Sequence, residues 1–295
     1  ESTSSYDRWI RQEIFTELRI RESKMRYTPA QKIILKAINI NDHIISGNSI
    51  SPPETIGQKS YYGQIIYYLK NKQLLKPKNL EFKYTYGFSK LISSLELTTE
   101  SKINYNQNLD ALEIRVFAGY NFHTTGDRYN LFIRGQDGFY DYLFDRTYLG
   151  RNINFPSPIA QQSSNSHGAF KINTSLGSSD SWLISTNISL KVPKVPINLF
   201  SDFGVYPNII YDVNTQQSTE EVKFLFNTGI SFNIKIQNKP LIGIYLPIFY
   251  SKAIEKSYVP GTNKEIGSLS SLQKITFVFN LNNINPFKIK KSIRP

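Results

Sequence analysis

The chain has 295 residues, which is room for two small domains or for one β-barrel, and its formal net charge is +12. Hydrophobic residues make up 40% of it, fewer than a densely packed soluble enzyme usually carries. Without cysteine, the chain has neither a disulfide framework nor a cysteine metal site. Its lysines and arginines are spread over the whole sequence, so the charge does not indicate a nucleic-acid-binding surface.

The first half of the chain alternates apolar and polar residues in strand-length runs. Ile10, Ile14 and Leu18 lie on one side of the first run, and although their spacing also fits a helix, we expect a strand. Gly47, Pro52, Pro53 and Gly57 indicate a long loop over residues 41–58. Further strands are expected at 32–40, 61–70, 80–88, 91–105 and 112–122.

The rhythm changes after a predicted hairpin turn at residues 124–127. We expect residues 129–134 to continue the strands and residues 135–166 to form a long insert. Strands are expected to resume at 168–176, 182–192, 197–205, 241–250 and 275–281. Residues 33–40 and 241–250 are apolar on both faces, which suits a strand covered by a plug and equally the core of a soluble protein.

The longest alternating run extends from Val222 to Ile236. Its even positions are almost wholly apolar and its odd positions almost wholly polar, over about 15 residues or roughly 50 Å. Strands of soluble domains have about 5–6 residues, whereas outer-membrane strands need about 9–11 to cross the hydrocarbon. The sequence therefore predicts a lipid-facing side opposite a wet lumen. The candidate lipid-facing residues are Phe224, Phe226, Ile230, Phe232 and Ile234.

No segment shows sustained helical periodicity, and no apolar run approaches the roughly 18 residues of a transmembrane helix. A long succession of strands closes into a barrel because closure removes the sheet edges. We therefore expect an all-β fold, an antiparallel transmembrane up-and-down β-barrel of about 12 strands, within a range of about 10–16. Residues 1–295 would form this single domain, with the insert folded into the lumen or rim.

Several short motifs between residues 110 and 290 resemble, in their order, a known family. In chain order they are Asp141-Tyr142-Leu143-Phe144-Asp145, Tyr148-Leu149-Gly150-Arg151, Gln161-Gln162, Gly168-Ala169-Phe170-Lys171, Leu199-Phe200-Ser201-Asp202-Phe203-Gly204, Gly229-Ile230-Ser231-Phe232, Ile244-Tyr245-Leu246-Pro247 and Leu281-Asn282-Asn283-Ile284-Asn285-Pro286-Phe287. They resemble the carboxy-terminal barrel region of Bacteroidetes proteins with an upstream zinc aminopeptidase-like (gluzincin) domain. More loosely, they are similar to outer-membrane assembly and translocation barrels of the surface-antigen type. The chain departs from the latter because it lacks periplasmic repeats and its final strand does not end on a terminal aromatic residue.

The resemblance implies a bacterial outer-membrane barrel that serves as a membrane anchor or assembly partner. Because the chain opens almost inside a strand, we expect a mature protein or the carboxy-terminal part of a larger metallopeptidase-like protein. The implied partners are outer-membrane lipid and lipopolysaccharide, with an upstream peptidase domain or an outer-membrane protein complex, and no nucleic acid. Two alternatives stay open: a pore or protein-translocation barrel, and a soluble all-β glycan-binding module.

Motifs for catalysis are missing from the sequence. His43, His123 and His167 form no His-Glu-x-x-His motif, and neither a Gly-x-Ser-x-Gly elbow nor a phosphate-binding loop occurs. We therefore expect no enzyme activity, cofactor or metal in this chain, with any zinc peptidase lying upstream. His167 is expected to be an ordinary loop residue.

Charged residues gather in and beside the insert. Asp141 and Asp145 are four residues apart, a spacing for which a glycosidase-like pair is conceivable, but an ion-paired loop tucked into the lumen is the simpler interpretation. Asp202 lies on a later strand and could face the lumen. We hypothesise an Asp–Arg lock between that strand and the insert. The candidate lock residues are Arg134, Asp141, Asp145, Arg146, Arg151 and Asp202.

Overall fold

The computed structural model describes residues 3–22, 28–47, 54–71, 73, 76–88, 91–106, 110–136, 138–146, 148, 161–212, 217–236, 239–260 and 263–279. Nearly all regular structure in these ranges is β-strand, and the α-helix α1 (Lys252–Glu255) has only four residues. Among the described residues, no helix has the length and apolar character to cross a membrane.

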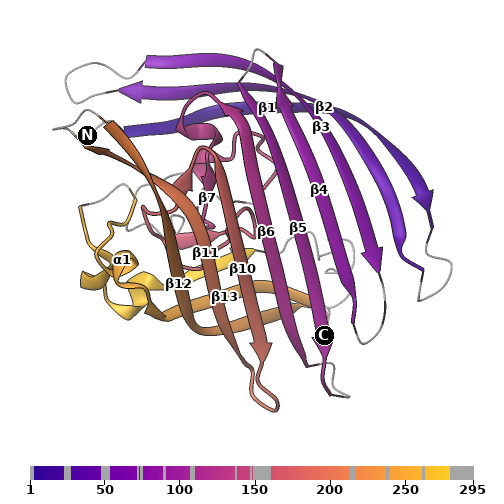
Figure 1. Ribbon diagram of the computed structural model, residues 1–295, viewed down its shortest axis with the longest axis vertical. Coiled ribbons are helices and arrows are strands. Elements are labelled where there is room, and N and C mark those ends of the chain that lie inside the picture. The colour runs from indigo at the N-terminus through magenta and orange to yellow at the C-terminus, as the bar shows by residue number, and fades with distance from the viewer. Residues whose placement is uncertain are drawn as a thin grey trace, which may run out of the picture.

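One 12-stranded sheet forms the wall of the molecule (Figure 1). Every strand except β8 follows the previous one in the chain and pairs with it in antiparallel fashion, whereas the short β8 (Gln162–Ser163) pairs in parallel with the last strand. The other strands are β1 (Thr3–Arg21), β2 (Ala30–Gly47), β3 (Glu54–Asn71), β4 (Lys78–Gly87), β5 (Ile92–Asn104), β6 (Ala111–Thr124), β10 (Trp182–Lys191), β11 (Ile197–Asp212), β12 (Gln217–Ile236), β13 (Lys239–Tyr250) and β14 (Thr276–Phe279).

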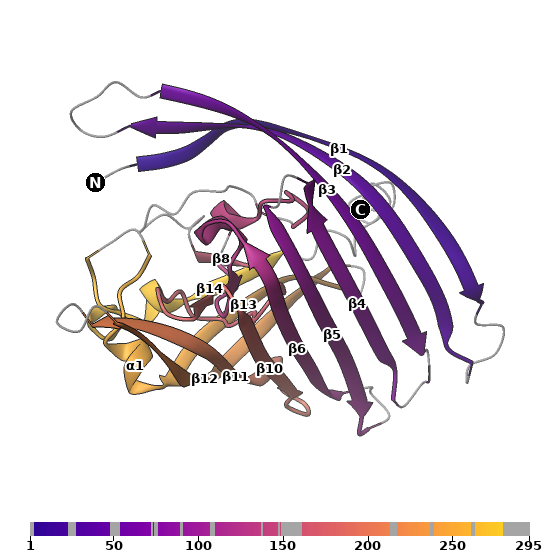
Figure 2. The ribbon, with the colours of Figure 1, turned by 45° about the horizontal axis from the view of Figure 1, so that its top comes forward.

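The sheet curls but is not closed into a barrel (Figure 2). Among the described residues β1 pairs only with β2, and β14 with β8 forms the opposite edge. The all-β, mostly antiparallel sheet of 12 strands is confirmed, whereas closure of these strands on one another is not found. In the open sheet β1 and β14 run the same way, so a direct pair between them would be parallel, unlike each long neighbour in the wall.

The two ends of the sheet differ in their connections. At one end, which we call the short-turn end, the connections are residues 22–29, 72–77, 105–110, 192–196 and 237–238. Two long connections lie at the other end, which we call the long-loop end. They are residues 125–181 between β6 and β10 and residues 251–275 between β13 and β14. We call the described residues of these connections the plug and the cap.

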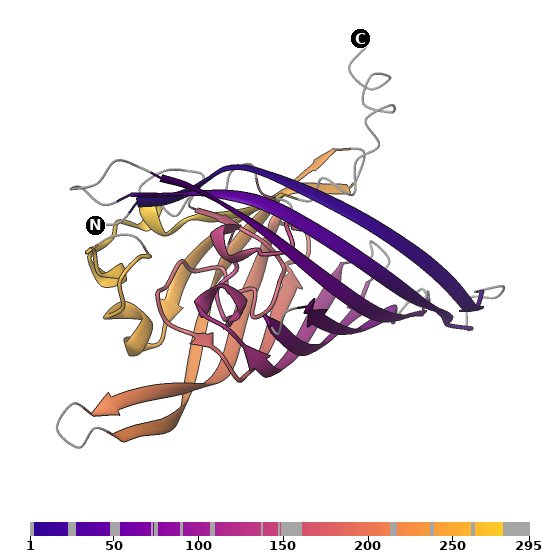
Figure 3. The same ribbon diagram turned by 90° about the horizontal axis from the view of Figure 1, so that it is seen from above.

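The plug lies on the concave side of the sheet, between β1–β3 and the wall formed by β6 and β10–β13 (Figures 2 and 3). It contains a second small sheet of β7 (Leu131–Phe132) and β9 (Ser178–Ser179) and three-residue 3-10 turns at Asp127–Tyr129 and Gly138–Tyr140. The wall strands predicted at 129–134 and 168–176 are wrong, because these residues belong to the plug, and within the two ranges only Leu131–Phe132 forms a strand, in the second sheet. Their apolar side chains are buried on all sides, as at Ile133 and Phe170. The alternation of apolar and polar residues there therefore does not indicate a strand with one buried and one exposed face.

The apolar core lies between the plug and the inner face of the sheet. One cluster joins Phe117, Leu183 and Leu225 of the wall to Ile133 and Phe170 of the plug, and the cap contributes further residues. A second cluster contains Ile38, Ile40, Tyr62 and Ile92 of the wall and Tyr129, Tyr142, Leu143 and Phe144 of the plug. The both-face apolar character of 33–40 thus reflects burial by the plug on the inner side, while Leu35 stays exposed on the outer side.

In the first three strands one expectation is confirmed and one boundary differs. The run around Ile14 is a strand throughout β1, which settles the helix alternative. The predicted loop 41–58 is shorter than expected, because β2 extends to Gly47 and β3 begins at Glu54. These residues pair in one continuous antiparallel ladder, so strand pairing overrides the turn-forming Gly57.

Gly204 on β11 gives a test of plug packing. A Cβ atom at this position would lie 2.3 Å from Ile133 Cδ1 of the plug, closer than atoms can approach. We expect Gly204→Val to lower the free energy of unfolding by about 1–3 kcal/mol, the usual cost of overpacking, and to increase protease cleavage within the plug. Phe203→Leu, on the outer face of the same strand, is the control and should leave plug cleavage unchanged.

Candidate functional site

Four polar side chains stand in line across the inner face of four neighbouring strands. Arg115 of β6 pairs in register with Asn187 of β10, Asn187 with Asp202 of β11, and Asp202 with Asn227 of β12. Because residues paired across an antiparallel ladder share a face, the four side chains point together towards the plug. We call Arg115, Asn187, Asp202 and Asn227 the docking row.

The docking row binds the backbone of one plug loop. Arg115 Nη1 donates to the His167 carbonyl at 2.8 Å, and Asn187 Nδ2 donates to the Gly168 carbonyl at 2.9 Å. In the opposite sense, the Lys171 backbone N–H donates to Asp202 Oδ2 at 3.0 Å. The strands therefore recognise the shape of the loop, because the groups that they bind are main-chain atoms.

Asp202 is the centre of this row. Asn187 Nδ2 donates to its Oδ1 at 2.9 Å, and Asn227 Nδ2 donates to its Oδ2 at 3.0 Å. The carboxylate is buried and receives three N–H donors, including that of Lys171. Such hydrogen bonds to a charged acceptor are roughly twice as strong as neutral ones.

The plug loop adopts a backbone that favours close approach. His167 and Ala169 have positive φ angles of 44° and 54°. A Cβ atom on Gly168 between them would lie 2.4 Å from the Ile133 carbonyl oxygen, so only glycine fits there. The loop is thus a tight turn built against the plug, and it presents its carbonyl groups to the docking row.

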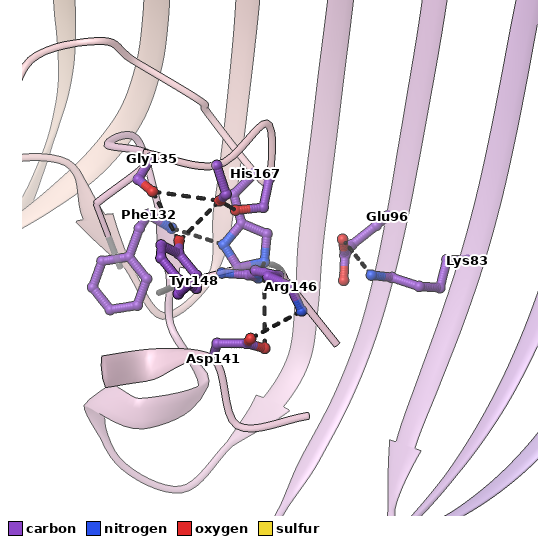
Figure 4. A network of polar contacts seen from close by, with 10 residues as sticks. Lys83, Glu96, Phe132, Gly135, Asp141, Arg146, Tyr148 and His167 are labelled. Atoms are coloured by element: carbon purple, nitrogen blue, oxygen red, sulfur yellow. Dashed lines mark hydrogen bonds and ion pairs between the residues drawn. The ribbon is translucent and has the colours of Figure 1, made fainter. Parts of the chain in front are cut away.

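A polar cluster lies behind this loop (Figure 4). Arg146 Nη2 lies 2.9 Å from His167 Nε2, and the Phe132 backbone N–H donates to Nδ1 of the same ring at 3.3 Å. Arg146 Nε lies 3.9 Å from Asp141 Oδ1, and the Arg146 backbone N–H donates to Asp141 Oδ2 at 3.1 Å. Tyr148 donates to the Gly135 carbonyl at 2.9 Å. The cluster therefore ties separate stretches of the plug together.

Burial and neighbouring cations lower the pKa values of two plug residues. Burial, with Arg146, Lys83 and Arg115 nearby, holds the pKa of the His167 imidazole well below its ordinary value of 6.5. The Phe132 backbone N–H donates to Nδ1, so a proton added at that nitrogen would break this hydrogen bond. Burial likewise lowers the pKa of the Lys171 amine to about 8, although Asp202 opposes that shift.

The inner face of the sheet away from the docking row is lined with ion pairs. Lys83 Nζ of β4 lies 3.0 Å from Glu96 Oε2 of β5 (Figure 4), and Lys32 Nζ of β2 lies 2.9 Å from Glu17 Oε2 of β1. Lys36 Nζ lies 3.7 Å from Glu13 Oε2. This part of the wall is therefore charged, in contrast to the apolar surface that the plug covers near β10–β12.

The structure places most of the predicted lock residues in or against the plug. Asp141 and Arg146 form an ion pair, and Asp202 binds the plug through the Lys171 backbone. Arg134 donates to the Thr174 carbonyl at 2.9 Å, its guanidinium lies over the Phe132 ring, and Asp145 is exposed. Arg151 lies outside the described residues.

Sequence reasoning missed Arg115, Asn187, Asn227 and the importance of His167, which is buried and central where an ordinary loop residue was expected. Polar residues at inward positions of adjacent strands were a usable signal. Recognising the row, however, requires the strand register, which the sequence does not show.

The candidate lipid-facing residues all lie on the outer face of β12. Phe224, Phe232 and Ile234 are exposed, and Phe226 and Ile230 are partly exposed, whereas Leu225 between them is buried. The outer and inner faces of this strand therefore meet different surroundings.

The described residues contain no group of three or more histidine, cysteine, aspartate or glutamate side chains placed to hold a metal ion. In comparisons with known proteins, neither a protein-family model nor a curated protein matches the sequence. The docking row can hold a folded segment, the plug, against the inner face of the curved sheet. It does so through hydrogen bonds between its side chains and the plug backbone.

Asp202→Asn tests the docking row. The amide would place an NH₂ group where N–H donors already point, so we expect the free energy of unfolding to fall by about 2–3 kcal/mol, as for loss of a buried charged hydrogen-bond partner. Denaturant unfolding followed by tryptophan fluorescence measures the change. Ser189→Ala, on the inner face of β10 but outside the row, is the control and should change stability by less than about 0.5 kcal/mol.

The neutral imidazole of His167 predicts a pH dependence. Since its pKa is lower in the folded state than in the unfolded chain, the unfolded state binds the proton first as the pH falls below 6.5. Stability should therefore be full above pH 6.5 and decline below it. His167→Gln should flatten this decline in unfolding experiments between pH 4 and 7, and the exposed His123→Gln should not.

Proposed function

We propose that this chain forms the wall and plug of a bacterial outer-membrane β-barrel that acts as a membrane anchor or assembly partner and carries no catalysis itself. The observation that carries the proposal is the outer face of the sheet. On each long strand that face presents exposed apolar side chains, which are unfavourable in water and favourable in lipid. Examples from ten strands are Ile14, Leu35, Ile65, Phe82, Leu97, Phe122, Ile184, Leu199, Phe224 and Ile248.

The inner face supports the same proposal. It carries the ion pairs Lys83–Glu96 and Lys32–Glu17 and the docking row. A transmembrane barrel has this distribution, apolar outside and polar inside. A soluble two-sheet sandwich needs the reverse, with apolar rows buried between its layers. Among the described residues no second layer covers Ile14 or Phe224, so the glycan-binding alternative has less support.

Closure in the membrane is part of the proposal. Lipid offers no hydrogen-bond partners, so the free backbone groups along the edge of β1 must be paired there. Because β1 and β14 run in the same direction, an antiparallel cylinder takes an odd number of further strands between them.

The plug favours an anchor over an open pore. It packs two apolar clusters against the wall and is bound by the docking row. We therefore propose a barrel that conducts little in planar bilayers. A large and steady conductance of the unmodified protein would favour the pore or translocation alternative.

A pair of neighbouring substitutions tests the membrane location. Leu97 lies on the outer face of β5 and Thr98 on the inner face. We expect Leu97→Arg to reduce flotation of the protein with lipid vesicles strongly, since arginine on the lipid face near the midplane costs about 2–4 kcal/mol. Thr98→Arg, the matched control, should float like the unmodified protein.

The membrane proposal fails if the unmodified protein stays monodisperse in buffer without detergent and does not float. It also fails if both arginine variants behave alike, because a lipid-facing wall must distinguish its two sides.

A further inference from the structure

The plug does not fill the space inside the sheet evenly. At the short-turn end, the inner face of β1–β5 lines a cavity of about 690 Å³. Tyr68, Glu81 and Thr98 lie in its wall, together with the Glu17–Lys32 ion pair. Four acidic and four basic side chains line it in all, so its charges balance. The charged groups in this lining favour water inside the cavity, because they keep their hydration where they can.

Charged groups continue along the wall above the cavity. The Lys83–Glu96 pair lies next along β4 and β5, and Lys36 lies near Glu13 on β2 and β1. On the plug side, Asp145 is exposed. A stripe of alternating charge therefore leads from the cavity into the interior, along the side of the lumen that the docking row does not occupy.

An apolar and ionic barrier ends this stripe towards the long-loop end. Tyr62 of β3 contacts Tyr129 and Tyr142 of the plug, with ring centroids 5.4 Å apart for Tyr62 and Tyr142. Trp9 of β1 stacks on Phe144 at 4.7 Å. We call these five residues, with Leu143, the aromatic seal. Hydrophobic constrictions of this kind stop water and ions by dewetting.

An ion pair adds to the seal. Arg128 Nη2 of the plug lies 2.5 Å from Asp42 Oδ2 of β2, and Asp42 is fully buried. Asp42 and Lys32 lie on the same face of β2, ten residues apart, so roughly 33 Å of strand lies between the ion pair and the cavity residue Lys32. The seal begins nearer, because Tyr62 pairs with Ile38, four residues or roughly 13 Å from the cavity residue Ile34. In a membrane the cavity and the charged stripe would span part of the hydrocarbon, which is about 30 Å thick, and the seal would lie within it.

We propose that the inner wall of β1–β5 and the front of the plug form a hydrated path for small hydrophilic solutes, closed by the aromatic seal and the Asp42–Arg128 pair. The inference rests on the proposed membrane location, because a path needs a closed wall. Because the cavity is lined by equal numbers of acidic and basic side chains, we expect small cations, anions and zwitterions to permeate the path at similar rates. The solute passes when the plug front moves from β1–β3, while the docking row holds the rest of the plug.

The chain has no cysteine, so single cysteines can map the path in vesicles with a charged methanethiosulfonate reagent. Glu100 lines the cavity, and Ser94 lies on the same face of β5, two residues from Ile92, which packs in the same cluster as Tyr62 and Tyr142, and is buried. We expect Glu100→Cys to react readily and Ser94→Cys to react slowly. Adding Tyr142→Ala should speed the reaction of Ser94→Cys about tenfold or more by opening the seal.

Planar-bilayer recording gives the second measurement. The unmodified protein should be nearly silent, and Tyr142→Ala or Leu143→Ser should show discrete conductance with a cation-to-anion permeability ratio near one. Flotation with vesicles is measured for every variant, so a failure of membrane insertion is seen separately and overturns the proposed function as well.

The path is overturned if the inserted variants stay silent and Ser94→Cys stays unreactive in them. It is also overturned if Ser94→Cys already reacts as fast as Glu100→Cys in the sealed protein, or if Glu100→Cys does not react at all.

Discussion

A β-strand has two faces, and in this protein the two faces of the wall strands meet different surroundings. On β12 the exposed Phe224 follows Lys223 and precedes the buried Leu225, and on β5 the exposed Leu97 stands beside the buried Glu96. A shift of one residue in any pairing would exchange these sides along a whole strand. The register therefore fixes the apolar exterior, the charged interior and the alignment of the docking row at the same time.

The plug buries apolar residues on the inner face of the sheet, as a second sheet does in a β-sandwich. Phe117, Leu183 and Leu225 of the wall are buried by Ile133 and Phe170, which come from one long connection. The apolar core is thus inside the curve of the sheet and small relative to the wall. This arrangement explains how a chain with only 40% hydrophobic residues can fold with long strands, since much of its apolar surface lies outside and is not part of the core.

The wall strands were predictable because one face of each is polar. Alternation located β5, β6, β10 and β12 and placed Phe224 and Phe232 on the outside. The same signal failed at 129–134 and 168–176, where plug residues are buried on all sides and alternation has no physical cause. Asp202 was found through its motif, but its partner is the Lys171 backbone, and a main-chain partner leaves no trace in the sequence. Closure could not be predicted from the number of strands, because alternation locates strands but does not show which edges pair.

The plug is attached differently on its two sides. Towards β6–β14, its backbone is bound: Arg115 and Asn187 hold carbonyl groups, Thr276 donates to the Lys171 carbonyl at 2.9 Å, and β8 pairs with β14. Towards β1–β3, side chains meet side chains, as in the Trp9–Phe144 stack and the Arg128–Asp42 pair. Releasing the plug from β6–β14 would break a strand pair and several hydrogen bonds to its backbone, whereas releasing it from β1–β3 separates contacts between side chains, which rotate more freely. A plug that moved without leaving the lumen would therefore part from β1–β3 first, on the side where the charged path lies.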